Sequence, residues 1–340
     1  MDQDTLCRLL SARPQGKIGV LGDFCTDVYW DIHPELGENS IETGLKTLPV
    51  TAARYSLGGA GNIVANLRGM GLNSIPCIGV SGSDPFGIWM KQELTAEIPE
   101  YASFFQLVRR KDYHTPVYCK PLIDSVEQQR IDLGNTPVED AEAETLLGAL
   151  EELMPRLKVL VINEQIPNGI HSPRFRKGFA GLVRRFEGKL HMVFDGRDFL
   201  DAYPGVTLKI NAHAASSLAF GDISHAPLES GRRILERSGR ELVITDGEKG
   251  CFVFEHDVTT FIPAIPAPGP VDTVGAGDSF SAGFSYALAA GADMVTAADF
   301  GNCCSAVTIR KLNQTGAPSP EELRSVVLES SAHSPEKQFF

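Results

Sequence analysis

The sequence lacks the features of a membrane-bound or exported protein. No apolar stretch approaches the roughly 20 residues that a membrane-spanning helix requires. The first four residues, M-D-Q-D, include neither a basic nor an apolar segment, so we expect no secretory signal. The seven cysteines form no C-x-x-C pair, and their odd number favours reduced, mostly buried thiols. These absences together predict a cytoplasmic protein without a membrane partner.

Positive charge is scarce, and three common catalytic motifs are missing. The chain has 31 Lys and Arg against 43 Asp and Glu, a formal net charge of -12, which argues against nucleic acid as a partner. No Walker A, G-x-S-x-G or H-E-x-x-H string occurs in the sequence. The sequence therefore gives no support to a P-loop nucleotidase, a hydrolase with a serine nucleophile elbow or a zinc protease.

The periodic segments predict the fold. The 340 residues are 43% hydrophobic, which is enough to bury a large core. From residue 158 onward, strands expected at 159–163, 190–195, 208–211 and 242–246 alternate with helices expected at 173–186 and 229–237. This alternation predicts one α/β domain over residues 1–340, with a mostly parallel central sheet and helices on both faces. Two polar, alternating segments, about 31–57 and 107–131, interrupt the pattern, and we expect them to form a small β lid.

The most informative stretch is 271–280, which reads V-D-T-V-G-A-G-D-S-F. A proline-rich segment precedes it and an apolar helical face follows it, so Gly275, Ala276 and Gly277 are expected in a turn that opens a helix. The free amides and partial positive charge of a helix start bind anions such as a phosphoryl group. Asp278 follows at once, and a carboxylate there is suited to accept a hydroxyl proton during phosphoryl transfer. The simpler alternative is a helix start that Asp278 stabilises without chemistry.

The whole string at 271–280 is more specific than its glycines alone. It resembles the second signature of the ribokinase-like (PfkB) carbohydrate kinase family, D-T-x-G-A-G-D-[ST]-F, and matches it at every defined position. In that family the position of Asp278 is the catalytic base, and the positions of Gly275, Ala276 and Gly277 form the anion hole. The resemblance extends over about residues 17 to 325 and implies the ribokinase-like fold.

A second glycine-rich stretch, 57–71, supports the same resemblance. It reads L-G-G-A-G-N-I-V-A-N-L-R-G-M-G and combines a glycine turn with an apolar helical face. The stretch is similar to the family's first signature, although its asparagine, Asn62, comes one residue earlier. The alternative is a glycine turn capped by Asn62. A nicotinamide-dependent dehydrogenase has weaker support, because the third glycine of the dinucleotide fingerprint and a following ribose-binding acid are missing.

Groups that bind hydroxyls gather near the first expected strand. Asp23, Asp27 and Asn62 carry carboxylate and amide groups suited to the vicinal hydroxyls of a sugar. Either aspartate taken alone more often stabilises a loop. The resemblance implies that the positions of Asp27, Gly58, Gly59 and Asn62 bind the acceptor sugar.

The resemblance also implies ATP, Mg2+ and a monovalent cation as cofactors. The run T-D-G-E-K-G at 245–250 is similar to the turn that lines the ATP phosphates in the family, which assigns Thr245 and Gly247 to the nucleotide. Asn302 matches a position beside the adenine. Asp272 and Thr273 lie where many family members hold a monovalent cation such as K+.

One departure from the family bears on magnesium. The family carries N-x-x-E on the strand that corresponds to 208–211, and its glutamate helps to place Mg2+ through water. Here Asn211 is present and remains a predicted nucleotide contact, but Ala214 replaces the glutamate. Loss of such a group costs roughly 10- to 100-fold in metal affinity or activity. Glu164 is the carboxylate that we expect to face the metal instead.

The sequence therefore predicts an ATP-dependent kinase that phosphorylates a hydroxyl of a sugar or sugar phosphate. Segments 22–30 and 128–132 resemble the kinase domain that acts on heptose 7-phosphate. Heptose phosphate is thus the first candidate acceptor, followed by other phosphosugars, free hexoses or pentoses, and nucleosides. The alternative, motivated by Ala214, is a catalytically weak or inactive sensor of sugar or nucleotide on the same fold. The family resemblance also suggests a homodimer formed through the lid.

Overall fold

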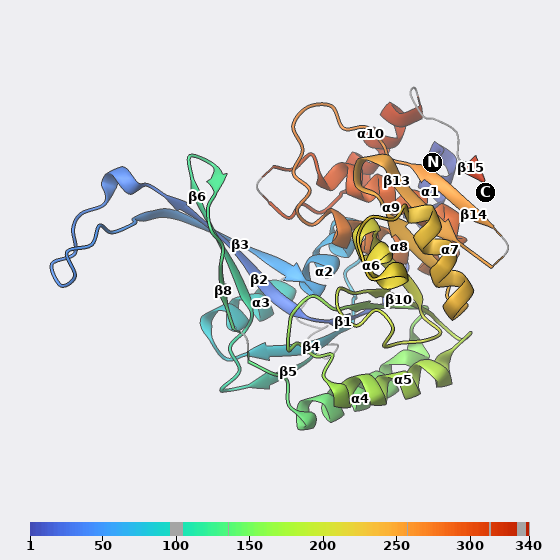
Figure 1. The fold of residues 1–340 in the computed structure, drawn as a ribbon, viewed down its shortest axis with the longest axis horizontal. Helices are drawn as coiled ribbons and strands as arrows, with labels where there is room; N and C mark the ends of the chain where they lie inside the picture. Colours follow the sequence, from blue (N-terminus) through green and yellow to red (C-terminus); the bar gives the residue numbers. More distant parts are fainter. Residues whose placement is uncertain (96–104, 135, 257, 313, 332–337, 340) are drawn as a thin grey trace.

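The body of the molecule is built on one large sheet (Figure 1). The computed structural model describes all residues except 96–104, 135, 257, 313, 332–337 and 340. The strands of this sheet are β1 (Ile18–Gly22), β4 (Cys77–Gly82), β5 (Phe105–Arg110), β9 (Val159–Asn163), β10 (His191–Asp195), β11 (Thr207–Asn211), β12 (Leu242–Thr245), β13 (Gly250–Phe254), β14 (Thr259–Pro263) and β15 (Gln338–Phe339). Their order is β15-β14-β13-β12-β11-β10-β9-β1-β4-β5. Strands β5 to β12 of this order pair in parallel, and β12 to β15 pair antiparallel.

Helices cover both faces of this sheet, as the sequence predicts. They are α1 (Gln3–Ala12), α2 (Ala60–Gly69), α3 (Pro85–Thr95), α4 (Asp140–Leu153), α5 (Pro173–Phe186), α6 (Ala212–Phe220), α7 (Pro227–Ser238), α8 (Ala276–Ala289), α9 (Met294–Thr308) and α10 (Pro320–Ser331). Successive residues of a strand face opposite sides, and β9 shows the consequence. Val159 and Val161 belong to the core under α2, α8 and α9, whereas Leu160 and Ile162 belong to the core under α4 and α5.

A second sheet forms the lid and projects from the body (Figure 1). It consists of β2 (Phe24–Ile32), β3 (Val50–Gly59), β6 (Val117–Ile123), β7 (Val126–Glu127) and β8 (Ile131–Leu133), in the order β3-β2-β6-β7 with β8 paired to β6. The connection 33–49 lies at the far end of this projection. Residues 107–110, which we expected in the lid, belong to β5 of the large sheet instead.

Two helices were not expected from the sequence. Helix α1 buries Leu6, Leu9 and Leu10 in the same core as α10. Helix α6 begins directly after β11, where the Asn211 side chain accepts a hydrogen bond from the Ala214 amide at 2.9 Å. The sequence motif at this position is therefore also a helix cap.

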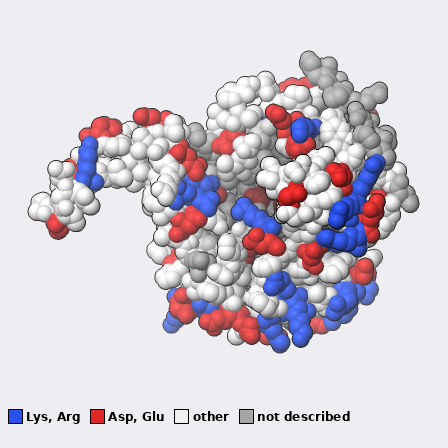
Figure 2. Space-filling view, in the orientation of Figure 1, with Lys and Arg blue, Asp and Glu red and all other residues white. Residues whose placement is uncertain are grey.

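The surface carries charges of both signs. Lys and Arg side chains are interspersed with Asp and Glu over the face shown in Figure 2. All seven cysteines are free thiols, and only Cys7 is exposed. Within the part of the chain that the structure describes, no helix has both the length and the apolar character to cross a membrane.

Candidate active site

The predicted anion hole lies at the start of α8. Gly275 precedes the helix with a φ of 78°, a left-handed backbone conformation that favours glycine. Ala276 and Gly277 form the first turn, and Gly277 is exposed to solvent. The first amides of a helix have no partner within the helix and carry partial positive charge. This turn therefore has the partial positive charge and the amide donors suited to a phosphoryl group, although the Ala276 amide also donates to the Thr273 carbonyl oxygen at 3.2 Å.

The two glycine-rich stretches of the sequence meet at Asp278. Its Oδ2 accepts a hydrogen bond from the side-chain amide of Asn62, at the start of α2, at 2.7 Å. Gln165 Nε2 lies 3.5 Å from the other carboxylate oxygen. Asn66 donates to the side-chain oxygen of Asn62 at 3.1 Å and to its carbonyl oxygen at 2.8 Å, which fixes the orientation of the Asn62 amide. Side chains from separate elements therefore hold the Asp278 carboxylate in one position.

The surroundings of Asp278 raise the pKa of its carboxyl group to about 7. The loss of surrounding water is the largest cause, although part of the side chain remains exposed. The Asp195 carboxylate also raises this pKa, while the hydrogen bond from Asn62 and the Lys209 ammonium lower it. A carboxyl group that titrates near neutral pH is a stronger base than an ordinary aspartate, so it is suited to accept a hydroxyl proton.

The lid contributes charged and polar side chains near this carboxylate. Asp27, on β2, is buried, and its own pKa is raised mainly by that burial. Lys120 Nζ, on the neighbouring β6, lies 3.5 Å from Asp27 Oδ1 and 3.1 Å from the Tyr29 hydroxyl. Asp27 is close enough to Asp278 for its charge to raise the pKa of that residue. Asp278 is thus within electrostatic reach of the lid.

Gly58 and Gly59 are required by the close packing of β3 on β2. A Cβ atom at Gly58 would lie 2.6 Å from Cys25 Sγ and 3.2 Å from Asp27 Oδ2. Gly59 has a φ of 56°, and a Cβ atom there would lie 2.4 Å from the Asp23 carbonyl oxygen. Side chains at either position would displace the backbone next to Asp27.

Asp23, which we predicted as a substrate ligand, makes structural contacts. It is buried, and its Oδ2 accepts hydrogen bonds from the amides of Gln165 at 2.9 Å and Ile166 at 3.0 Å. Its Oδ1 accepts a hydrogen bond from the Ile170 amide at 2.8 Å. Asp23 therefore orders the loop that carries Gln165 to Asp278.

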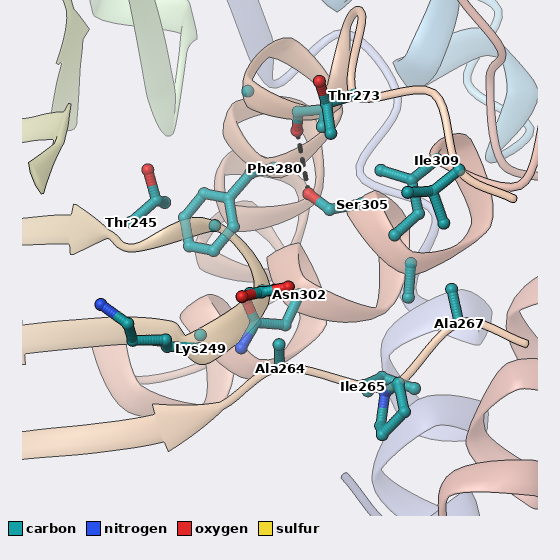
Figure 3. A pocket seen from close by; sticks show the side chains of 18 of the residues that line it. Thr245, Lys249, Ala264, Ile265, Ala267, Thr273, Phe280, Asn302, Ser305 and Ile309 are labelled. Carbon is teal, nitrogen blue, oxygen red and sulfur yellow. Dashed lines mark hydrogen bonds between the residues drawn. The ribbon is translucent and has the colours of Figure 1, made fainter.

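A cleft of about 910 Å³ borders the start of α8 (Figure 3). Apolar side chains, including Ile265, Phe280 and Ile309, form much of its wall, which suits a flat aromatic base. Ala276 and Gly277 of the anion hole also line it. The predicted nucleotide and cation residues on its wall are Thr245, Gly247, Thr273 and Asn302.

Asn211 lies beside this cleft rather than on its wall. It pairs in register with Thr245 of β12, and its side-chain oxygen is occupied by the Ala214 amide. Ala214 lies in the first turn of α6 and provides no carboxylate there. Asn211 thus caps α6, next to the strand residue Thr245 that lines the cleft.

Glu164, the predicted metal-facing carboxylate, is buried at the end of β9. Its Oε2 accepts hydrogen bonds from the amides of Arg197 at 2.7 Å, Asp198 at 2.8 Å and Phe199 at 3.3 Å. These contacts order the loop after β10, and Glu164 is not among the residues that line the cleft. Oε2 thus has a structural role, whereas the other carboxylate oxygen, Oε1, is buried and has no hydrogen-bond partner among the described residues.

Asp272 and Thr273 form the approach to the anion hole. The Asp272 amide donates to the carbonyl oxygen of Ile309 at 2.9 Å, and its Oδ1 accepts a hydrogen bond from the Val274 amide at 3.0 Å. The Thr273 carbonyl oxygen accepts a hydrogen bond from the Ala276 amide at 3.2 Å. Carboxylate and carbonyl oxygens of this kind are the ligands that hard cations take.

Four residues of the site were missed by sequence reasoning. Gln165 and Lys120 approach Asp278 and Asp27, and Asp195 and Lys209 form an ion pair at 2.9 Å beneath α8. A signal existed for both lysines, because each lies between two apolar residues of a strand, where a charge needs a buried partner. No local pattern in the sequence identifies that partner.

The amino-acid sequence of this chain is similar to sequences of known carbohydrate kinases and their relatives. Residues 200–322 match the pfkB family carbohydrate kinases. The chain is 28% identical over 316 residues to the bifunctional protein HldE of Geobacter metallireducens, an alignment that covers 89% of this chain and 61% of that protein. The chain thus spans less than two thirds of the length of this relative.

Solved structures with the same fold confirm the ribokinase-like architecture. A ribokinase from Thermotoga maritima superimposes with a TM-score of 0.68 at 18% identity, covering 92% of this chain and 99% of that one. An Arabidopsis thaliana ribokinase complexed with ribose and ATP gives a TM-score of 0.65 at 17% identity, with the same coverage. The family match includes the segment of Asp278 and Asn302, so this part of the chain is similar to the pfkB family carbohydrate kinases, and the solved structures show the ribokinase-like fold over the rest.

Proposed function

We propose that the protein transfers the γ-phosphoryl group of ATP to a hydroxyl of a sugar or sugar phosphate. The observation that carries this proposal is the position of Asp278. It lies in the helix turn that borders the 910 Å³ cleft, and Asn62 of the other glycine-rich stretch donates a hydrogen bond to it. A base in this position has the nucleotide cleft on one side and the lid with Asp27 on the other.

Each part of the site has a role in this reaction. Asp278 accepts the proton of the acceptor hydroxyl as the oxygen attacks the γ-phosphorus in line. Amides of Gly275, Ala276 and Gly277 stabilise the charge on the phosphoryl group during transfer. Asp27 and Asn62 bind hydroxyls of the acceptor. The lid excludes water, which otherwise competes as the acceptor.

The proposed cofactors are ATP with Mg2+, together with a monovalent cation such as K+. Magnesium neutralises charge on the nucleotide phosphates and usually keeps several waters, so it does not require a full set of protein ligands. Within the described residues no cluster of three or more His, Cys, Asp or Glu has metal-site geometry. Asp272 and Thr273 offer oxygen ligands for the monovalent cation beside the anion hole. Because ATP is a cytoplasmic metabolite, we place the reaction in the cytoplasm.

Heptose phosphate is the acceptor that we place first. Segments 22–30 and 128–132 resemble the heptose 7-phosphate kinase domain, and the curated relatives are named HldE. The lid carries two basic side chains, each paired with a carboxylate: Lys120 with Asp27, and Arg130 with both oxygens of Asp132 at 2.6 and 2.8 Å. Either cation could exchange its carboxylate for the phosphate of a phosphorylated sugar, because cations bind both groups.

The proposal is tested by ADP release over a panel of acceptors. The panel contains a heptose 7-phosphate, hexose phosphates, free hexoses and pentoses, and nucleosides, each with and without K+. We expect Asp278→Asn to lower kcat by roughly 100- to 10,000-fold. Asp293→Asn is the matched control, because Asp293 caps α9 away from the cleft and asparagine caps equally well.

Two outcomes would contradict this proposal. Turnover of Asp278→Asn near the wild-type rate would remove Asp278 as the base. Calorimetric binding of sugar and ATP without ADP release from any acceptor would favour the alternative motivated by Ala214, a sensor on the same fold.

We further propose that the protein is a homodimer formed through the lid. The lid exposes several large apolar side chains, and a second copy is the partner that would remove them from water. These residues are Leu36, Ile41, Leu45, Leu48, Val50, Tyr55, Val126, Ile131 and Leu133.

A further inference from the structure

A buried ion pair lies under the start of α8. Lys209 is on β11 and Asp195 is at the end of the adjacent β10, where the two residues are paired in register. Both are buried, and Lys209 Nζ lies 2.9 Å from Asp195 Oδ2. Removing two charges from water is costly, and well-packed apolar residues of similar volume are often at least as stabilising. Packing alone therefore does not account for this pair.

Both charges of the pair also contact α8. Lys209 Nζ donates to the carbonyl oxygen of Gly277 at 3.2 Å. The Ser281 hydroxyl donates to Asp195 Oδ2 at 2.6 Å. Gly277 and Ser281 are four residues apart and thus lie on one face of the helix. The pair connects β10 and β11 to the turn that carries the anion hole and Asp278.

We propose that Lys209 and Asp195 are positioning residues for phosphoryl transfer: Lys209 fixes Gly277 in the anion hole, and the pair sets the charge that Asp278 experiences. This inference rests on the proposed role of Asp278 as the base. A hydrogen bond from a charged donor holds a carbonyl group more firmly than a neutral one. The peptide group that joins Gly277 to Asp278 is thereby kept in a fixed direction, which pre-organises the end of the anion hole and the backbone of the base.

The two members of the pair act on Asp278 in opposite directions. The Asp195 carboxylate raises the pKa of Asp278, and the Lys209 ammonium lowers it. The other groups that face Asp278 are Asn62 on α2, Gln165 after β9, and Asp27 and Cys25 on β2. None of these changes when Lys209 or Asp195 is replaced. Replacing Lys209 and replacing Asp195 should therefore shift the pKa of Asp278 in opposite directions, which can be tested.

The test is the pH dependence of kcat/KM in two single variants. Asp195→Asn is expected to move the acidic limb downward by roughly one pH unit, and Lys209→Met upward by a similar amount. Lys209→Met is also expected to lower kcat by roughly 10- to 100-fold while KM for ATP changes little. Lys209→Arg keeps the charge and should restore most of the wild-type pH profile. A purely structural pair would lower activity without opposite shifts of the limb.

A second measurement does not depend on turnover. The carboxyl carbon of Asp278 is observed by NMR in protein labelled at aspartate, and Asp278→Asn identifies its signal. If the pKa of Asp278 shifts in opposite directions in the two variants, the inference is supported, whether or not any acceptor is phosphorylated. A failure to phosphorylate every acceptor would reject the proposed function but not this inference. Shifts in the same direction, or none, overturn the inference.

The double variant covers the case in which a single variant fails to fold. Asp195→Asn with Lys209→Met leaves no unpaired buried charge. It still lacks the hydrogen bond to the Gly277 carbonyl, so kcat is expected to remain roughly 10-fold or more below wild type. A double variant with wild-type kcat and wild-type pH profile also overturns the inference.

Discussion

The start of α8 and the lid differ in how deeply their residues are buried and in how many other elements pack against them. Residues 279–289 of α8 are all buried, and Asp278 just before them is in contact with side chains from other elements. The cluster of buried apolar residues within the lid is small among the described residues, Val28, Val117 and Cys119, and the first six residues of β3 are exposed. The groups proposed for phosphoryl transfer are thus fixed by the interior of the body. The surface proposed for assembly is instead the exposed face of the lid.

The sharpest way to examine this contrast is to compare the stability of the two cores. Phe284 is fully buried in α8, and Phe284→Ala is expected to lower the free energy of unfolding by about 3–5 kcal/mol. Val117→Ala in the lid removes two buried methyl-sized groups and should cost about 1.5 kcal/mol. Urea unfolding measures both values. Equal losses would show that the lid is packed as firmly as the body.

The pH dependence of catalysis tests whether the buried site controls the base. Asp278 must be ionised to accept a proton, and its pKa is raised to about 7. The value of kcat/KM should therefore fall roughly tenfold for each pH unit below that point. An acceptor without a phosphate group avoids a second titration. A profile that stays flat down to pH 5 would indicate that Asp278 titrates like an ordinary aspartate.

The proposed dimer interface on the lid can be tested by introducing charged residues into it. Ile41 is fully exposed, and Ile41→Glu combined with Leu45→Glu should convert the proposed dimer to a monomer in analytical ultracentrifugation. A like-charge pair at the interface and the lost apolar contact both oppose association. Ile223→Glu, at an exposed apolar position of the body, is the matched control and should leave the dimer intact. A monomeric wild type would contradict the proposed assembly.

The smallest expected effect concerns the missing glutamate of α6. Ala214→Glu should lower the Mg2+ concentration needed for half-maximal activity by up to about tenfold. The new side chain is also at the third position after the Asn211 cap, where a glutamate stabilises a helix start. Ala214→Gln has the same shape without the charge and should leave the Mg2+ requirement unchanged. Equal effects of both variants would assign the gain to the helix cap alone.

Local patterns predicted most of the α/β body. Helix α5 and strand β9 have the bounds that periodicity gave, because each has an uninterrupted apolar face and a clear start or end. Helix α6 was missed because Asn211 and Ala214 were interpreted only as part of a ligand motif. The lid boundary at residue 107 was wrong because an alternating pattern describes a strand of either sheet equally well.

The site was predicted less completely than the fold. Asp278 and Asn62 belong to recognisable strings, and their contact at 2.7 Å agrees with a shared cleft. Asp23 and Glu164 have suitable chemistry, but their partners are backbone amides of distant loops, which a linear sequence does not reveal. The Asp195–Lys209 pair depends on the register of two parallel strands, and no short motif encodes that register.

Strand β3 of the lid continues without a break into α2, with Gly59 as the last residue before the helix. Four residues, 56–59, separate the exposed part of β3 from α2, which carries Asn62, and the last two of them are Gly58 and Gly59. A rotation of the lid must therefore be absorbed by the torsion angles of these two glycines or be passed on to the hydrogen bond between Asn62 and Asp278. In the proposed reaction, the covalent chain thus links acceptor binding at the lid to the position of the Asp278 carboxylate.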